Sequence, residues 1–371
     1  MKRIKSVEVL YEGKLVGKLS EYRDRLVAFQ YTQSWLSEGF SISPFSLPLS
    51  EKLYFSSLEP FDGLFGVFDD CLPDGWGMLL TDRMLRSWGI EPASVSNITR
   101  LSLLGNNAKG ALSFRPCQLE DDNANTDVDY DQLYEQCSFI LADKDISDLD
   151  NLYKMAGNSG GARPKANVTI DGESWIMKFP SHFDSRDIGL QEYSYSLAAA
   201  ECGIRTVECR LLPSSKTSGY FACKRFDRKP KNGRVHMISA VGLLETSHRF
   251  PNLDYLHLLK LTSILTRNME ETENMFRLMC FNEFAHNRDD HAKNFSFLYD
   301  DSKRSWYMSP AYDLTYSSSI NGEHATTING KGSDPSVEDM LNVGTKCGLD
   351  RRRCKGILES IKETVDKAKL F

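Results

Sequence analysis

The stretch "HNRDDHAKNFSFLYD" at residues 286–300, continued by "DSKRSWYMSPAYD" at 301–313, places many polar side chains directly before an apolar run. The alternation in 295–300 and 304–308 predicts two strands joined by a short turn, with a helix over 273–286 before them. A hairpin folds its two ends together. We therefore expect Asn294 and Asp313 to lie close in space although they are far apart in the chain.

This stretch also carries the spacing of a phosphotransfer site. Asp289 lies five residues before Asn294, and Asp313 follows the predicted hairpin. The catalytic loop of a protein kinase has this arrangement, in which an aspartate serves as base and an asparagine and a second aspartate hold magnesium. Oxygen ligands are those that magnesium prefers. We therefore predict Asp289 as the base, Asn294 and Asp313 as metal ligands, and Lys293 beside the transferred phosphoryl group.

A second set of residues follows the order of a kinase small lobe. The small-residue loop "GNSGGARPK" at 157–165 would let backbone N–H groups approach phosphates. Two strands flank the turn Asp171-Gly172, and the second strand ends at Lys178 before a helix that contains Glu192. In a kinase this lysine contacts the phosphates and the glutamate pairs with it. "KRFDR" at 224–228 could form the hinge beneath the adenine of a nucleotide, or it could be only a charged strand end.

Other interpretations of these residues stay open. The polar residues could cap helices and close turns, and Lys178 could extend from a strand end into solvent. A metal-dependent hydrolase could use His286, Asp289, Asp290 and His291, although it would leave the 157–165 loop unexplained. A catalytically silent kinase fold that binds a partner is the third possibility.

Composition limits the class of protein. The chain has 371 residues, 41% of them hydrophobic and 26% charged, which is typical of globular domains. A net charge of −6 argues against a dominant nucleic-acid surface. The nine cysteines form no CxxC pair, so we expect reduced, mostly buried thiols in a cytoplasmic protein. We expect neither a signal peptide nor a membrane span.

The pattern along the chain predicts four segments. The start is β-rich, with a hairpin around Glu12-Gly13, and the last residues form an amphipathic helix with Ile357, Ile361 and Val365 on one side. Residues 120–131 contain six acids and no base, which indicates a solvated linker. We expect an N-terminal subdomain, an acidic linker, a β-rich small lobe and a helical large lobe, at residues 1–119, 120–136, 137–228 and 229–371.

Taken together, these motifs resemble the HipA-like serine/threonine kinases, the toxins of bacterial type II toxin–antitoxin systems. The segments that carry the resemblance are "FDDCLPDGWGMLLTDRML", "LSLLGNNAKGALSF", "GNSGGARPK", "WIMKFP", "QEYSYSLAAAECGI", "KRFDR", "DDHAKNFSF" and "SPAYDLT". "DDHAKNFSF" with the downstream "AYD" is the most specific of them. The resemblance implies an α+β, bilobal protein-kinase-like fold with an N-terminal β-rich subdomain, and it implies a requirement for ATP and Mg²⁺.

The resemblance also implies a set of site residues. The base matches Asp289, and the metal ligands match Asn294 and Asp313. The residues implied to contact ATP are Gly160, Gly161, Ala162, Arg163, Pro164, Lys165, Lys178, Glu192, Lys224, Arg225, Phe226, His291 and Asn294.

Family members phosphorylate protein serines, in known cases on aminoacyl-tRNA synthetases. A helix-turn-helix antitoxin of the HipB type commonly holds them, so that contact with DNA is indirect. Many members also carry a regulatory serine four residues before the loop alanine that matches Ala162. Asn158 occupies that position here, which leaves Ser159 as the candidate for self-phosphorylation.

Overall fold

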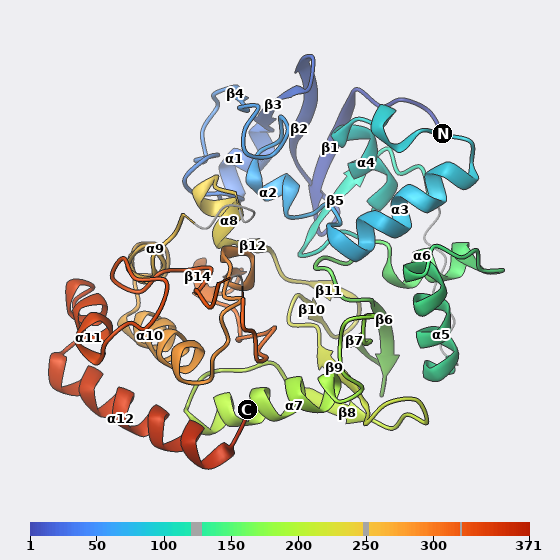
Figure 1. Cartoon of the computed structure of the whole chain (residues 1–371). Coiled ribbons are helices and arrows are strands. Elements are labelled where there is room, and N and C mark those ends of the chain that lie inside the picture. The colour runs from blue at the N-terminus through green and yellow to red at the C-terminus, as the bar shows by residue number, and fades with distance from the viewer. Residues whose placement is uncertain (120–127, 248–251, 320) are drawn as a thin grey trace. The chain divides into compact units, whose positions relative to one another are not determined.

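The computed structural model describes residues 1–119, 128–247, 252–319 and 321–371 (Figure 1). These residues form a mixed α/β fold with two compact units. Unit 1 consists of residues 1–187, 212–238 and 242–246, and unit 2 consists of residues 188–211, 239–241 and 247–371.

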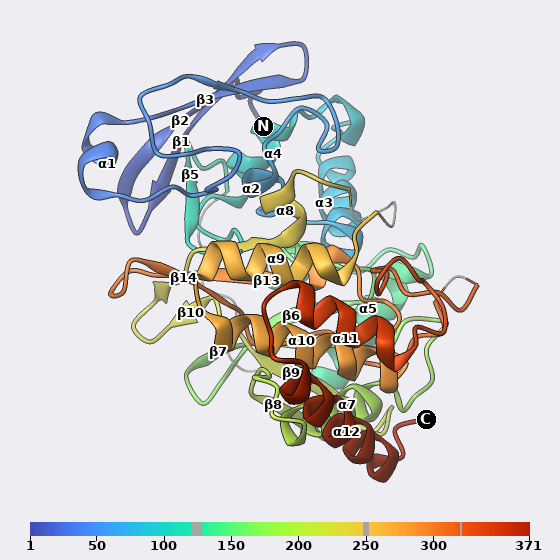
Figure 2. The same cartoon turned by 90° about the vertical axis from the view of Figure 1, so that its left-hand side faces the viewer.

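Unit 1 begins with a five-stranded sheet whose strand order is β4-β3-β2-β1-β5. The predicted hairpin at Glu12-Gly13 is confirmed, because both residues have positive φ and the flanking strands pair from Tyr11–Lys14 to Ser6–Ser20. Figure 2 shows β1, β2 and β3 side by side. The strands are β1 (Ser6–Tyr11), β2 (Lys14–Arg23), β3 (Leu26–Tyr31), β4 (Tyr54–Phe55) and β5 (Leu112–Arg115).

Helices pack beside this sheet and build the core of unit 1. Ser96 accepts a hydrogen bond from Thr99 N and so caps α4, which packs on β1, β2 and β5. Trp76 and Tyr153 lie in one apolar cluster, where α3 packs on α6. The helices are α1 (Gln33–Glu38), α2 (Gly66–Asp69), α3 (Gly75–Ser87), η1 (Pro92–Ser94), α4 (Asn97–Leu104), α5 (Tyr130–Leu141) and α6 (Leu149–Ala156).

A second sheet of unit 1 contains β6, β7 and β9. The predicted turn at Asp171-Gly172 is confirmed: both residues have positive φ, and the strands pair from Ile170–Glu173 to Lys165–Lys178. The remaining strands before residue 240 are short. The strands are β6 (Lys165–Ile170), β7 (Glu173–Lys178), β8 (Cys209–Leu212), β9 (Tyr220–Lys224), β10 (Arg228–Lys229), β11 (Gly233–Arg234) and β12 (Met237–Ser239).

Unit 2 is mainly helical, as the apolar periodicity after residue 250 predicts. Ile357, Ile361 and Val365 are buried on one side of α12, which packs on α7, α10 and α11. The hairpin of β13 (Ser296–Asp300) and β14 (Ser305–Met308) lies in the same unit. The helices are α7 (Ile188–Glu201), α9 (Tyr255–Thr266), α10 (Met269–Phe284), η2 (Ala292–Asn294), α11 (Val337–Lys346) and α12 (Arg351–Ala368); α8 covers Ala240–Leu244.

The predicted acidic linker at 120–136 lies partly outside the described residues, at 120–127. Its last part is helical, because α5 starts at Tyr130 with Asp129 as its N-cap. All nine cysteines are free thiols, and six of them are buried. Within the described ranges, no helix combines the length and the apolar character needed to cross a bilayer.

Candidate active site

The hairpin of unit 2 draws the two ends of the candidate site together. Beyond the paired strands, Ser309 N donates to the carbonyl of Ser296 at 2.9 Å. The hydroxyl of Tyr312 donates to the carbonyl of Lys293 at 2.6 Å and lies 2.6 Å from Ser296 Oγ. The residues next to Asn294 and Asp313 are thus hydrogen-bonded to each other. The predicted hairpin is confirmed, and it positions the backbone on both sides of the candidate metal site.

The loop at 289–294 is closed by its own hydrogen bonds. It ends in the short helix η2, in which Asn294 N donates to the carbonyl of His291 at 2.8 Å. The side-chain nitrogen of Asn294 donates to the carbonyl of Asp289 at 2.9 Å. This bond uses the side-chain nitrogen and not the amide oxygen, and the oxygen is the atom through which an asparagine binds a cation. Asp289 itself is exposed.

Asp313 has a left-handed backbone conformation, with φ of 54°. This conformation is unfavourable for most residues other than glycine and is found at sites that the surrounding structure fixes. Ala311, two residues earlier, makes two backbone hydrogen bonds. Its N–H donates to Arg205 O at 2.7 Å, and its carbonyl accepts from Val207 N at 3.2 Å. Two strand-like contacts therefore hold the chain directly before Asp313.

A buried hydrogen-bonding network around Asp290 supports the loop at 289–294. Asp290 Oδ2 accepts from the Tyr255 hydroxyl at 2.7 Å and lies 2.8 Å from His324 Nδ1, while Asp290 Oδ1 accepts from Thr326 N at 3.2 Å. His324 Nε2 lies 2.8 Å from Glu283. Burial opposes a charge on His324, but the hydrogen bonds to the two carboxylates outweigh it and raise its pKa to about 9.

This network bears on the hydrolase alternative. Both carboxylate oxygens of Asp290 accept hydrogen bonds inside the protein, so Asp290 supports the loop. In the part of the chain that the structure describes, no three His, Cys, Asp or Glu side chains are grouped to hold a metal ion. No local sequence signal pointed to Tyr255 or His324. A buried aspartate needs partners, but the spacing does not say which residues they are.

The loop at 157–165 in unit 1 follows α6 and leads into β6. Gly160 and Gly161 are adjacent residues of this loop without side chains, and the ammonium of Lys165 lies 2.8 Å from the position that a Cβ of Gly161 would take. Lys165 pairs with Lys178 across β6 and β7. The ammonium of Lys178 lies 5.5 Å from the centre of the Phe221 ring. Two lysines thus stand on neighbouring strands at the end of the glycine loop.

Three further residues of the loop, Ser159, Arg163 and Pro164, make contacts within unit 1. Arg163 forms an ion pair with Asp184 at 3.0 Å, and the carbonyl of Pro164 accepts from Phe179 N at 2.8 Å. The hydroxyl of Ser159 donates to the carbonyl of Ala156 at 2.6 Å. Ala162 is exposed.

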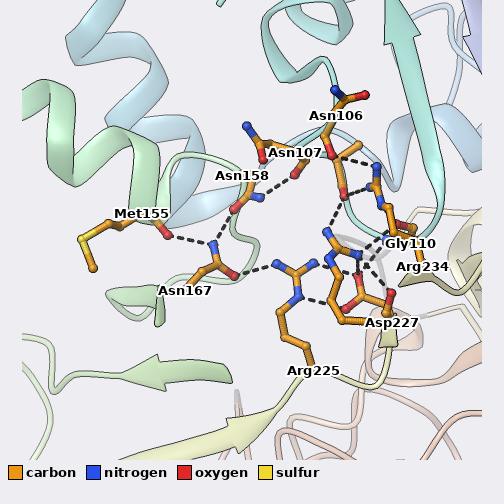
Figure 3. Close-up of polar contacts among 11 residues, drawn as sticks. Asn106, Asn107, Gly110, Met155, Asn158, Asn167, Arg225, Asp227 and Arg234 are labelled. Atoms are coloured by element: carbon orange, nitrogen blue, oxygen red, sulfur yellow. Dashed lines mark hydrogen bonds and ion pairs between the residues drawn. The ribbon is translucent and has the colours of Figure 1, made fainter. Parts of the chain in front are cut away.

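The candidate hinge at Lys224, Arg225 and Phe226 is anchored by a buried ion pair (Figure 3). Arg225 donates to both carboxylate oxygens of Asp227, at 2.9 and 2.7 Å, and to Asn167 Oδ1 at 2.7 Å. The side chain of Arg225 therefore supports the strand end from within unit 1. Lys224 pairs with Glu173 at 2.6 Å.

The same network reaches Asn158. Asn167 donates to Asn158 Oδ1 at 2.8 Å, and Asn158 donates to the carbonyl of Asn107 at 2.5 Å (Figure 3). Asn158 thus joins the start of the glycine loop to β6 and to the chain between α4 and β5. The composition of the loop did not predict this contact.

The predicted site residues belong to both units. The glycine loop, Lys178 and the hinge lie in unit 1, and residues 289–294 and Asp313 lie in unit 2. Glu192 is buried on α7 of unit 2. The pairing of Lys178 with Glu192 stays a prediction, as does the convergence of the Asn294 and Asp313 oxygens on a cation.

Comparison with known proteins places this arrangement in a family. Residues 157–369 match the HipA-like C-terminal domain, and residues 7–115 match the HipA N-terminal domain. Two relatives from Sinorhizobium fredii are named "Putative kinase Y4dM" and "Putative kinase Y4mE". The first is 26% identical over 99% of this chain and 91% of its own, and the second is 27% identical over 84% and 77%.

A solved structure shares the fold. It is the complex of HipA, HipB and operator DNA from the toxin–antitoxin system of Shewanella oneidensis. It matches 98% of this chain and 89% of its own with a TM-score of 0.74 at 18% identity. Because one family domain alone covers more than half of the chain, this protein belongs to the HipA family.

Proposed function

We propose that the protein is an ATP- and magnesium-dependent protein serine/threonine kinase of the HipA type. The observation that carries the proposal is the hairpin-held loop of unit 2, in which Tyr312 bonds to Lys293 beside Asn294 and Asp313. The two relatives that bear kinase names support the same assignment.

The donor set fits a hard cation. Asn294 offers an amide oxygen and Asp313 a carboxylate, and magnesium takes such ligands together with phosphate oxygens. When bound, magnesium neutralises charge on the phosphates during transfer. Ala311, two residues before the left-handed Asp313, is hydrogen-bonded to Arg205 and Val207, which holds the chain just before this carboxylate.

Each of the predicted site residues has a separate role in the proposed transfer of the phosphoryl group. The exposed carboxylate of Asp289 orients the attacking hydroxyl and accepts its proton. Lys293 offsets charge on the transferred group. The backbone N–H groups of the loop 157–165, with Lys165 and Lys178, bind the phosphates of ATP. The buried partners of Asp290 keep the loop that carries Asp289 rigid.

Membership of the family supports a proposal for the acceptor and the partner. We propose a protein serine or threonine as acceptor, with an aminoacyl-tRNA synthetase as the first substrate to test, and Ser159 as the candidate for self-phosphorylation. We propose a HipB-like antitoxin as partner, because the solved complex of similar fold contains HipA, HipB and operator DNA. Contact with DNA would then be made through the antitoxin.

The proposal is tested by incubating the purified protein with γ-labelled ATP, magnesium and host lysate. The wild type should label a protein. Asp289→Asn should lower transfer by about 100-fold or more while ATP binding persists, because a positioned base contributes about 10² to 10⁴. The matched control is Asp366→Asn on the exposed face of α12, which should transfer like the wild type.

Two results would contradict the proposal. Undiminished transfer by Asp289→Asn would remove this carboxylate from the role of base. ATP binding without any labelled product, in the wild type, would instead favour a kinase fold that serves only for binding.

A further inference from the structure

The turn at residues 74–77 runs directly against the glycine loop. Trp76 N donates to the carbonyl of Gly161 at 2.9 Å, and Trp76 Nε1 donates to the carbonyl of Lys165 at 3.1 Å. In return, Gly161 N donates to Asp74 Oδ1. All four residues belong to unit 1. Three hydrogen bonds therefore join the HipA N-terminal domain to both ends of the segment 161–165.

Asp74 is an N-cap residue whose side chain does not cap its own helix. It stands at the N-cap of α3, where an aspartate commonly accepts hydrogen bonds from the first N–H groups of its own helix. Its side chain makes no such capping bond, and its carboxylate accepts from the glycine loop instead. The side chain of Asp74 therefore binds a backbone N–H that is distant in sequence, and it makes no capping bond to α3.

The two glycines of the turn make this close approach possible. A Cβ on Gly75 would collide with the carbonyl oxygen of Gly161, and a Cβ on Gly77 would collide with the carbonyl oxygen of Ser159. Glycine lets two backbones pack at a distance that any side chain would prevent. Between them, Trp76 is only 1% exposed and fixes the turn in the core of unit 1.

A lysine from the N-terminal domain stands beside the same loop. The ammonium of Lys109, between α4 and β5, lies 2.7 Å from the position that a Cβ of Gly160 would take, and Asp74 Oδ1 lies 2.9 Å from that position. Lys165 stands in the same relation to Gly161, at 2.8 Å. Two ammonium groups therefore face the two glycines, where phosphate oxygens would approach the backbone.

We propose that the HipA N-terminal domain is a working part of the nucleotide site. The turn 74–77 holds the backbone of the glycine loop in place, which makes Asp74 and Trp76 positioning residues. Lys109 adds a cation that binds a phosphate oxygen beside Gly160. The role of Lys109 rests on the proposed kinase function, whereas the support of the loop by the turn does not.

The support of the loop is tested by amide hydrogen exchange on the full chain without nucleotide. Asp74→Ala and Gly77→Ala should speed exchange of the Gly161 amide by about tenfold or more, since a lost hydrogen bond to a charged acceptor opens the loop. Gly356→Ala is the matched glycine control, because nothing lies within 4 Å of its Cβ position, and it should leave this amide unchanged. If Gly77→Ala does not fold, Asp74→Ala decides alone. Exchange as slow as in the wild type would overturn the proposed support.

The role of Lys109 is tested by titration calorimetry with magnesium-ATP. Lys109→Met should weaken binding by about tenfold while the Gly161 amide keeps its protection, since one charge-assisted contact is lost. The control, Lys52→Met on an exposed residue, should bind as the wild type does. Unchanged affinity in Lys109→Met would overturn this role. If the wild type itself binds no ATP, the proposed kinase function fails, and the exchange experiment still decides the support of the loop.

Discussion

Two neighbouring aspartates have opposite environments at this site. Asp289 is exposed, as a group that meets a substrate hydroxyl must be, whereas Asp290 is 1% exposed and bonded to Tyr255, His324 and Thr326. A buried carboxylate is stable only with such partners. Asp289 thus faces solvent, and Asp290 holds the loop in place.

The charge on His324 gives a pH-dependent prediction. Its pKa is raised to about 9 in the folded protein, against an unfolded value near 6.5. Its stabilising effect is therefore fully present below pH 6.5 and is lost as the pH rises through about 9. We expect the wild type to exceed His324→Gln in free energy of unfolding by an amount on the order of 3 kcal/mol at pH 6, and by much less at pH 10.

Urea unfolding of both proteins across this pH range measures the difference. Subtracting the variant removes the contribution of groups that titrate in both proteins. A constant difference between pH 6 and pH 10 would mean that His324 is not protonated between Asp290 and Glu283.

Among the elements, the hairpin β13–β14 has the most direct effect on the candidate site. The Tyr312 hydroxyl contacts Ser296 at the start of β13 and donates to the carbonyl of Lys293 in η2, so it connects the hairpin to that short helix. Tyr312→Phe removes both bonds and keeps the ring. We expect kcat to fall by about tenfold, because a loop positioned less well loses transition-state contacts, with a small change in KM for ATP.

The control for that variant is Tyr307→Phe on β14, which should keep the wild-type kcat. Steady-state kinetics with the identified substrate separates kcat from KM. Equal kcat values for the wild type and Tyr312→Phe would show that these bonds do not position the loop.

The helix α12 gives a prediction about stability. Ile361 is 0% exposed, so Ile361→Ala should lower the free energy of unfolding by about 2 to 5 kcal/mol through lost burial and a cavity. Ile264 on α9 is 63% exposed, and the same substitution there should cost less than about 0.5 kcal/mol. Chemical denaturation of both variants checks the contrast, which would fail if the two losses were equal.

Local patterns explain which elements could be predicted. Positive-φ turns at Glu12-Gly13 and Asp171-Gly172 and the apolar spacing of Ile357 and Ile361 depend on neighbouring residues, so the sequence contains the signal. The support of Asp290 by His324 joins residues 34 positions apart, and that of Gly161 by Asp74 joins residues 87 apart. Nothing in the local spacing specifies such pairs, because only the folded chain brings them together.

At the scale of the whole molecule, the chain forms two units, and residues 229–238 and 242–246 belong to unit 1. Residues 188–211, which include α7 and Glu192, cluster with the helical unit 2. The reason is physical: α7 packs on α12 within that unit. Of the predicted site residues, the glycine loop and Lys178 belong to unit 1, and Glu192, Asp289, Asn294 and Asp313 belong to unit 2.

The central claim is that Asn294 and Asp313 hold the metal ion of a phosphotransfer site. The most direct measurement is a crystal structure with Mn²⁺ in place of magnesium and a non-hydrolysable ATP analogue, with the metal located by its anomalous signal. We predict one or two peaks coordinated by Asn294 Oδ1, the Asp313 carboxylate and phosphate oxygens. Metal and nucleotide bound away from both residues would contradict the account.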